Sequence, residues 1–128
     1  MGGRAVRVFK NSWFERFARK EGITDAALCE AVSRASKGLV DADLGGGVIK
    51  QRVARPGAGK SGGYRTLIFC RAKTRAIFAF GFAKSDMGNV RSADLADLKK
   101  AARVVLALSD AEIDEWLTAG LFVEVDCG

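Results

Sequence analysis

The spacing of apolar residues predicts two short helices near the N-terminus. Apolar positions recur at helical spacing over residues 12–22, where Ser12 is a suitable N-cap and Gly22 a suitable stop. A second run over residues 24–38 opens on Thr24 and has the same period. The connection between the runs is short, so the two helices should form a hairpin. The apolar stripe of the second helix consists of Leu28, Val32 and Ala35.

Further along the chain, the period changes from that of helices to that of strands. Residues 48–54 alternate with a period of two, as a half-buried strand does. Runs rich in aromatic and β-branched residues follow at 64–71 and 75–83. A short polar turn at residues 72–74 joins the last two runs. Such short links favour an antiparallel meander of three strands, because parallel strands need longer crossovers.

The third strand, at residues 75–83, is largely apolar on both sides. Strict alternation places Ile77, Ala79, Gly81 and Ala83 on one face, and on the other face Phe78, Phe80 and Phe82. A strand that is apolar on both sides is usually covered on both sides. We therefore expect this strand at the centre of the sheet.

The last third of the chain predicts two more helices and a short strand. Ser92 can cap a long helix with apolar residues at helical spacing. The S-x-x-E sequence at residues 109–112 is a capping box, and the helix that it opens should end at Gly120. Residues 121–125 have the composition of a final strand. The predicted fold class is α+β, a single domain over residues 1–128 in which a helical hairpin packs on a small twisted antiparallel sheet, with helices at the C-terminus.

Basic residues are concentrated in the predicted strands. The chain has a formal net charge of +6, and residues 44–85 hold nine Lys and Arg but no Asp or Glu. Residues 1–43 have a net charge of +2 and residues 86–128 a net charge of −5. Because the cations of the middle block have no carboxylate beside them in sequence, they should form a positive surface that meets a polyanion. The alternative is a solvated face that pairs with the acidic C-terminal helices.

The glycine-rich segment GAGKSGG, at residues 57–63, looks like a phosphate-binding P-loop. A P-loop enzyme requires a helix directly after the loop, because the helix N-terminus binds much of the anion. Two glycines close the segment instead, and the run after them favours extended backbone. The segment should therefore connect two strands of a hairpin. A nucleotide-binding enzyme remains an alternative only if a helix begins at Gly62.

Composition argues against several other classes of site. The chain has no histidine, and its cysteines, Cys29, Cys70 and Cys127, are odd in number and widely spaced, which indicates neither a disulfide framework nor a zinc site. They are expected to be idle thiols in a reducing cytosol. The strands lack the clustered carboxylates of a Mg²⁺-dependent nuclease, so neither a metal nor a cofactor is expected. No signal peptide or membrane span is predicted, which indicates a soluble cytoplasmic protein.

Five cations should converge on one face of the sheet. By alternation, Lys50 and Arg52 lie on the same side of the first strand. Arg65 opens the strand that should pair with it, Lys60 lies in the glycine-rich connection, and Lys84 follows the third strand. We expect these side chains to form one exposed anion-binding surface.

Such a surface can cleave RNA without a metal ion. The 2′-OH of the RNA attacks the adjacent phosphorus, while the protein moves protons and stabilises charge on the phosphate oxygens. Lys50, with Arg52 beside it, is the candidate for proton transfer, because neighbouring cations disfavour the charged form of a lysine. Arg65 is the candidate for clamping the scissile phosphate, with Lys84 completing the charge stabilisation. The RNA-binding candidates are Arg55 and Lys60 for phosphates and Tyr64 for stacking on a base.

The run DLGGGVIKQRVARPGAGKSGGYRTLIFCR, together with IFAFGFAKSD, resembles the RelE/HigB-like toxins of bacterial type II toxin-antitoxin modules. The shared features are a basic strand, a glycine-rich basic loop, G-Y-R opening the next strand and a Lys closing the third. The resemblance implies a helical hairpin on a twisted antiparallel sheet and metal-independent cleavage of mRNA, generally in the ribosomal A site. It also implies a cognate antitoxin, typically a helix-turn-helix DNA-binding protein, that covers the basic face.

The resemblance also assigns roles to individual residues. An arginine follows the last lysine in the best-known members, whereas this chain has Ser85, and the tyrosine expected a few residues later has no counterpart near Val90. These departures favour the alternative of a non-catalytic toxin of the same fold, such as a ParE-like gyrase poison, or a nucleic-acid-binding protein. The catalytic positions of RelE-like enzymes are matched by Lys50, Arg52, Arg65 and Lys84.

Overall fold

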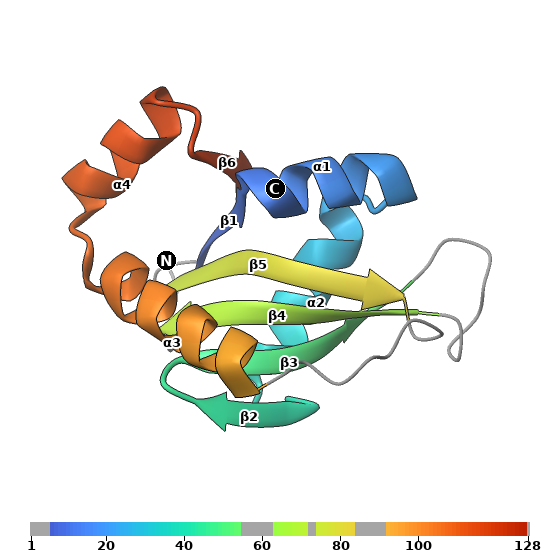
Figure 1. The fold of residues 1–128 in the computed structure, drawn as a ribbon. Helices are drawn as coiled ribbons and strands as arrows, with labels where there is room; N and C mark the ends of the chain where they lie inside the picture. The colour runs from blue at the N-terminus through green and yellow to red at the C-terminus, as the bar shows by residue number, and fades with distance from the viewer. Residues whose placement is uncertain (1–5, 55–62, 72–73, 84–91, 128) are drawn as a thin grey trace.

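The computed structural model describes residues 6–54, 63–71, 74–83 and 92–127, which form helices on both faces of a sheet (Figure 1). The helices are α1 (Ser12–Glu21), α2 (Asp25–Ser36), α3 (Ser92–Ala107) and α4 (Asp110–Thr118). The strands are β1 (Arg7–Asn11), β2 (Ala42–Gly45), β3 (Val48–Val53), β4 (Tyr64–Arg71), β5 (Arg75–Ala83) and β6 (Phe122–Val125). The α+β class and the helical hairpin are as predicted.

The six described strands form a mixed sheet in the order β2-β3-β4-β5-β1-β6. The meander β3-β4-β5 is antiparallel, and β5 lies inside the sheet, as predicted. The prediction of a purely antiparallel sheet is wrong, because β1 pairs with β5 in parallel. The strands β1 and β2, with only five and four residues, were not predicted. Strands this short lack a clear alternating pattern. Pairing defines them, with the distant strands β5 and β6 for β1 and with the adjacent strand β3 for β2.

Capping side chains define the helix ends. Asn11, and not the predicted Ser12, caps α1, since its side chain accepts a hydrogen bond from the backbone N–H of Phe14 at 2.8 Å. Thr24 caps α2 as predicted, and Ser109 forms the predicted capping box with Glu112. These local signals fix the helix boundaries because each satisfies backbone N–H groups that have no partner inside the helix.

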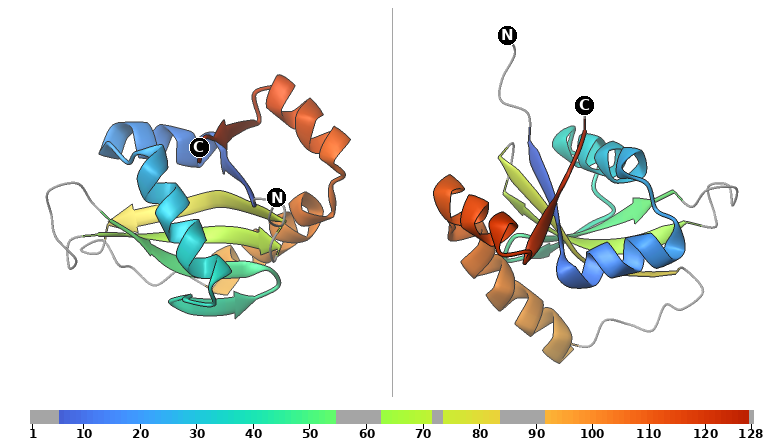
Figure 2. Two further views of the ribbon diagram at one scale, coloured as in Figure 1. Left: turned by 180° about the vertical axis from the view of Figure 1, so that it is seen from behind. Right: turned by 90° about the horizontal axis from the view of Figure 1, so that it is seen from above.

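Helices cover both faces of the sheet (Figure 2). The pair α1 and α2 packs on one face over a core that includes Phe14, Leu28 and Phe78. Helix α3 packs on the opposite face, called here the α3 face, over a second core that includes Leu67 and Val105. The sheet therefore separates two hydrophobic cores.

A β-bulge changes the expected orientation of the third strand. In the β4–β5 ladder Leu67 pairs with Phe80, but the next residue, Ile68, pairs with Phe78, so one residue of β5 is left unpaired. Such an extra residue breaks the strict alternation of side chains. The prediction that Phe78, Phe80 and Phe82 share a face is therefore wrong. Phe78 enters the core beneath α1 and α2, whereas Phe80 packs against the core on the α3 face.

Two cysteines form a disulfide that the sequence analysis did not predict. Cys29 in α2 is bonded to Cys127, which follows β6, across a sequence separation of 98 residues. Their Cα atoms are 5.6 Å apart, within the usual range for a disulfide. The expectation of idle thiols is wrong for this pair, and Cys70 is a free cysteine. No local spacing of cysteines predicts a disulfide between residues so far apart in the sequence.

Arg75 holds the C-terminal end of α3 against the sheet. Its side chain is buried, and its Nη1 donates to the carbonyl oxygens of Val105 at 2.9 Å and Leu108 at 2.7 Å. Its Nη2 forms an ion pair with Asp110 at 3.3 Å, and Arg71 donates to the carbonyl of a neighbouring residue in α3. The last carbonyls of a helix lack intrahelical N–H partners. Val105 also accepts a hydrogen bond from the backbone N–H of Leu108 at 3.3 Å, so the guanidinium adds donors at this end of α3 and complements the helix dipole. Two cations of the carboxylate-free block are thus structural.

We expect the substitution Arg75→Met to lower the free energy of unfolding by about 2–3 kcal/mol, because it removes the hydrogen bonds to the carbonyls of Val105 and Leu108 and the ion pair with Asp110 while retaining most of the side-chain volume. Urea unfolding followed by circular dichroism measures the loss. Arg71→Met is the matched control, and its exposed side chain should cost less than about 1 kcal/mol. Equal losses for the two variants would contradict this role of Arg75.

Candidate functional site

Three of the predicted site residues lie on the α3 face of the sheet. Arg52 of β3 pairs with Arg65 of β4, and Lys50 pairs with Leu67, which belongs to the core on that face. Side chains of directly paired residues point to the same face. Lys50, Arg52 and Arg65 therefore form one group, called here the basic surface. Arg55, Lys60 and Lys84 lie outside the described residues.

The basic surface lies at the end of the sheet where β3 stops and β4 begins, whereas α3 crosses the other half of this face (Figure 1). The stem of Lys99 in α3 lies against Gly46, and Leu106 lies against Gly47, at the turn between β2 and β3. Arg52 is exposed, while Lys50 and Arg65 are half-buried. The three cations can therefore be reached by a ligand that approaches the end of the sheet that the described helices leave uncovered.

The cations of the basic surface form no ion pair with the carboxylates that the structure describes. In the part of the chain that the structure describes, the ion pairs engage five other cations, and none engages Lys50, Arg52 or Arg65. The paired cations are Arg7, Lys10, Arg19, Arg34 and Arg75. The alternative of cations of residues 44–85 paired with the C-terminal helices holds for Arg75, which forms an ion pair with Asp110 of α4, but not for the described part of the basic surface.

Arg65 carries an unsatisfied donor at the centre of this group. Its Nη1 is buried and has no hydrogen-bond partner among the described residues. Arg65 lies between Arg52 on β3 and Phe82 on β5. A buried guanidinium nitrogen without an acceptor costs free energy, so such a group calls for an explanation. A phosphate oxygen is an acceptor of the right charge for this position.

The backbone behind the basic surface is held from the opposite face. The guanidinium of Arg34 in α2 donates to the carbonyl oxygen of Arg52 and forms an ion pair with Glu30 at 2.7 Å. Gln51, fully buried, donates to the carbonyl oxygens of Ala31 and Leu39, each at 3.0 Å. These contacts fix β3 on the helical hairpin, so the alternate side chains of β3 are presented on a rigid strand.

Comparison with protein families identifies the fold. The family described as the RelE toxin of the RelE / RelB toxin-antitoxin system matches residues 6–125. The chain belongs to the RelE toxin family. A comparison with curated proteins finds no significant match. Family membership makes the chain a toxin of a toxin-antitoxin system and implies an antitoxin as its partner.

Tyr64 has a structural place in this RelE-family toxin, contrary to the predicted base-stacking role. Its side chain is 1% exposed, and its hydroxyl donates a hydrogen bond to Glu21 at 2.8 Å. Its ring meets that of Phe17 edge-on, with ring centroids 5.6 Å apart. A ring buried in this way cannot stack on a base. The alternation of β4 directs Tyr64 beneath α1, opposite to its neighbour Arg65.

Aromatic side chains beside the basic surface were missed as site residues. Phe82 pairs with Arg65 and Phe80 pairs with Leu67, so both lie on the α3 face of this RelE fold. Strict alternation predicts both rings on the same face as Phe78, which is a residue of the core beneath α1 and α2. The bulge that separates them from Phe78 has no signal in the sequence, so only the pairing register reveals their position.

Other reactive groups of the toxin do not form a competing site. Burial raises the pKa of the Cys70 thiol, and Asp43 raises it further, which makes this thiol a poor nucleophile. Among the described residues, no three His, Cys, Asp or Glu side chains are placed to hold a metal ion. None of the described helices has the length and apolar character to span a membrane.

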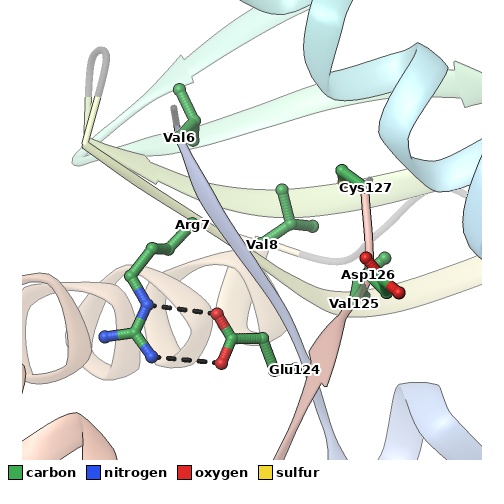
Figure 3. Close-up of a pocket in the computed structure, with 7 residues that line it drawn as sticks. All are labelled: Val6, Arg7, Val8, Glu124, Val125, Asp126 and Cys127. Carbon is green, nitrogen blue, oxygen red and sulfur yellow. Dashed lines mark hydrogen bonds and ion pairs between the residues drawn. The ribbon is translucent and has the colours of Figure 1, made fainter. Parts of the chain in front are cut away.

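A hollow of about 470 Å³ lies between β1 and β6, at the opposite edge of the sheet from β2 and β3 (Figure 3). Arg7 and Glu124 face each other across it through two hydrogen bonds of 3.1 Å. Hydrogen bonding to Glu124 raises the pKa of Arg7 above its ordinary value. Glu124 neutralises Arg7, and Asp126 also lines the hollow, so this hollow has no excess positive charge to bind an anion, unlike the basic surface.

Proposed function

We propose that this RelE-family toxin is a metal-independent endoribonuclease that cleaves mRNA on the ribosome. The main support is Arg65, whose buried Nη1 has no partner among the described residues, within a group of cations that the described carboxylates leave unpaired. A phosphodiester supplies the missing acceptor and the missing negative charge. The family to which the chain belongs supports the assignment as a toxin.

The proposed reaction uses a nucleophile within the RNA. The 2′-oxygen attacks the adjacent phosphorus, Lys50 accepts the 2′-OH proton, and the bond from phosphorus to the 5′-oxygen breaks. Arg65 and Arg52 stabilise the charge that develops on the phosphate oxygens. The leaving 5′-oxygen takes up a proton from water and Lys50 returns its proton to the solvent, which gives a 2′,3′-cyclic phosphate and a 5′-hydroxyl. Lys84, Lys60 and Arg55 are proposed to bind the phosphates of the same RNA.

The proposed function also defines the partners. A ribosomal target places the toxin in the cytoplasm, where its antitoxin would cover the basic surface until the toxin is released. We propose that this antitoxin is a helix-turn-helix DNA-binding protein. A small reading frame beside the gene that encodes such a protein would support this assignment.

Cleavage by purified protein tests the proposal. The toxin is added to translating ribosomes, and the 5′ ends of the mRNA fragments are mapped by primer extension. We expect cleavage without added metal ions beyond those that the ribosomes require, and about a 100-fold lower rate for Lys50→Ala. Lys20→Ala is the matched control, because Lys20 is exposed on α1 on the other face of the sheet. Intact mRNA with the unaltered protein would overturn the proposal.

A second candidate function is supported by the departures from the RelE pattern at Ser85 and Val90. A toxin of the same fold that poisons DNA gyrase would use the basic surface for binding without cleavage. In that case, production of the toxin would stop replication while mRNA remained intact on ribosomes. Measuring incorporation of labelled thymidine and methionine after induction distinguishes the two functions.

A further inference from the structure

The basic surface is bordered by aromatic rings on the next strand. The pairing register creates two rows across the sheet, in which Arg52 and Arg65 lead to Phe82, and Lys50 and Leu67 lead to Phe80. Neighbouring strands are about 4.8 Å apart, so Phe82 lies one strand spacing from Arg65. Cations therefore lie on β3 and β4, and aromatic rings lie on β5, where Phe82 is directly beside Arg65.

A third ring extends this aromatic border. Trp13 of α1 lies over Phe80 with ring centroids 4.5 Å apart, and Phe80 lies 6.2 Å from Phe82. Trp13 is 38% exposed, and Phe82 is half-buried. Within the described residues, neither ring belongs to either hydrophobic core. Trp13 also stacks on Phe17 of α1, with ring centroids 5.2 Å apart, so neighbouring aromatic rings hold it in place at this border.

We propose that Phe82, together with Phe80 and Trp13, is a stacking platform for unpaired bases of single-stranded RNA. The inference rests on the proposed function, since the phosphates of the same strand would lie on Arg52 and Arg65. A base is separated from its phosphate by one sugar, which matches the arrangement of a ring one strand away from a cation. The platform assigns a base-binding role to residues other than the buried Tyr64.

Charge complementarity selects this ligand over an apolar protein segment. A partner at Phe82 must also face the cations of β3 and β4, which the described carboxylates do not pair, so it combines flat apolar groups with regularly spaced negative charges. Single-stranded RNA has both properties, and every base has a face that can stack. Duplex RNA does not fit, because its bases are stacked on one another and leave no base face free for a ring.

Two oligomers separate stacking from charge. One is a short RNA with 2′-O-methyl groups, which prevent cleavage, and the other is an abasic oligomer with the same number of phosphates. We expect Phe82→Ala to weaken binding of the base-bearing oligomer roughly tenfold and to leave binding of the abasic oligomer unchanged. Phe82→Tyr should retain the affinity, whereas Phe82→Leu, which keeps the apolar volume, should not. Circular dichroism of each variant establishes that the fold is intact.

Trp13 provides a second readout. In a Trp116→Phe background it is the sole tryptophan, since the chain has two. Its fluorescence should be quenched by the base-bearing oligomer and not by the abasic one.

Any of three results would overturn the inference. They are an equal effect of Phe82→Ala on binding of both oligomers, unaltered binding of the base-bearing oligomer by Phe82→Leu, and no binding of RNA by the toxin. In the first two cases the proposed function survives if ribosomal cleavage still depends on Arg65. Loss of antitoxin binding by Phe82→Ala, with RNA binding unchanged, would instead assign the aromatic border to the antitoxin.

Discussion

Replacing Arg65 with alanine should abolish growth arrest by this toxin and lower its rate of mRNA cleavage by about 100- to 1000-fold. This is the usual loss when one preorganised donor to a developing negative charge is removed. Arg65 pairs with Arg52 in the β3–β4 ladder, and its buried Nη1 lacks a partner among the described residues. The expected loss therefore arises in binding and catalysis. Colony counts after induction and cleavage on translating ribosomes measure it.

The same substitution should not destabilise the protein. A residue with an unsatisfied buried donor contributes little to folding, so the melting temperature of Arg65→Ala should equal or exceed that of the unaltered protein. Arg65→Lys keeps the charge but loses the planar fork, and we expect an intermediate rate. Arg16→Ala, at an exposed position of α1, is the matched control. A large loss of stability in Arg65→Ala would show that the guanidinium is structural and would contradict its role as a phosphate clamp.

Cys127→Ser should lower the free energy of unfolding by about 3 kcal/mol. The disulfide between Cys29 and Cys127 spans 98 residues of sequence, and a crosslink that closes such a long loop strongly restricts the unfolded chain. It also joins the end of the edge strand β6 to α2, so its loss should first loosen β6. Urea unfolding measures the change, and hydrogen exchange of β6 locates it.

Reduction provides the matched comparison for this prediction. Dithiothreitol should destabilise the unaltered protein as much as the substitution does and should leave Cys127→Ser unchanged. Cys70→Ser controls for loss of a thiol as such, because Cys70 is not bonded. Since reducing compartments disfavour disulfides, toxin activity should be measured in both redox states. Equal stability of the oxidised and reduced proteins would contradict a stabilising disulfide.

Local signals in the sequence predicted much of the fold. Thr24 and the pair Ser109 and Glu112 mark helix starts because capping involves residues that are close in the chain. The meander β3-β4-β5 follows from alternation and short links. The strands β1 and β2 could not be predicted in the same way, because each is too short to have a clear pattern of its own. Pairing defines them, with the distant strands β5 and β6 for β1 and with the adjacent strand β3 for β2.

Local patterns in the sequence predicted the positive charge of the basic surface and the side of the strand on which two of its cations lie. Period-two alternation is a local property of a strand, so it placed Lys50 and Arg52 on one side, and the absence of carboxylates over residues 44–85 predicted their excess charge. Only the tertiary structure decided which faces the helices cover. That packing buried Tyr64 and used Arg75 to hold α3, and the β5 bulge placed Phe82 beside Arg65. These outcomes depend on contacts between distant segments, whose free energies no local pattern encodes.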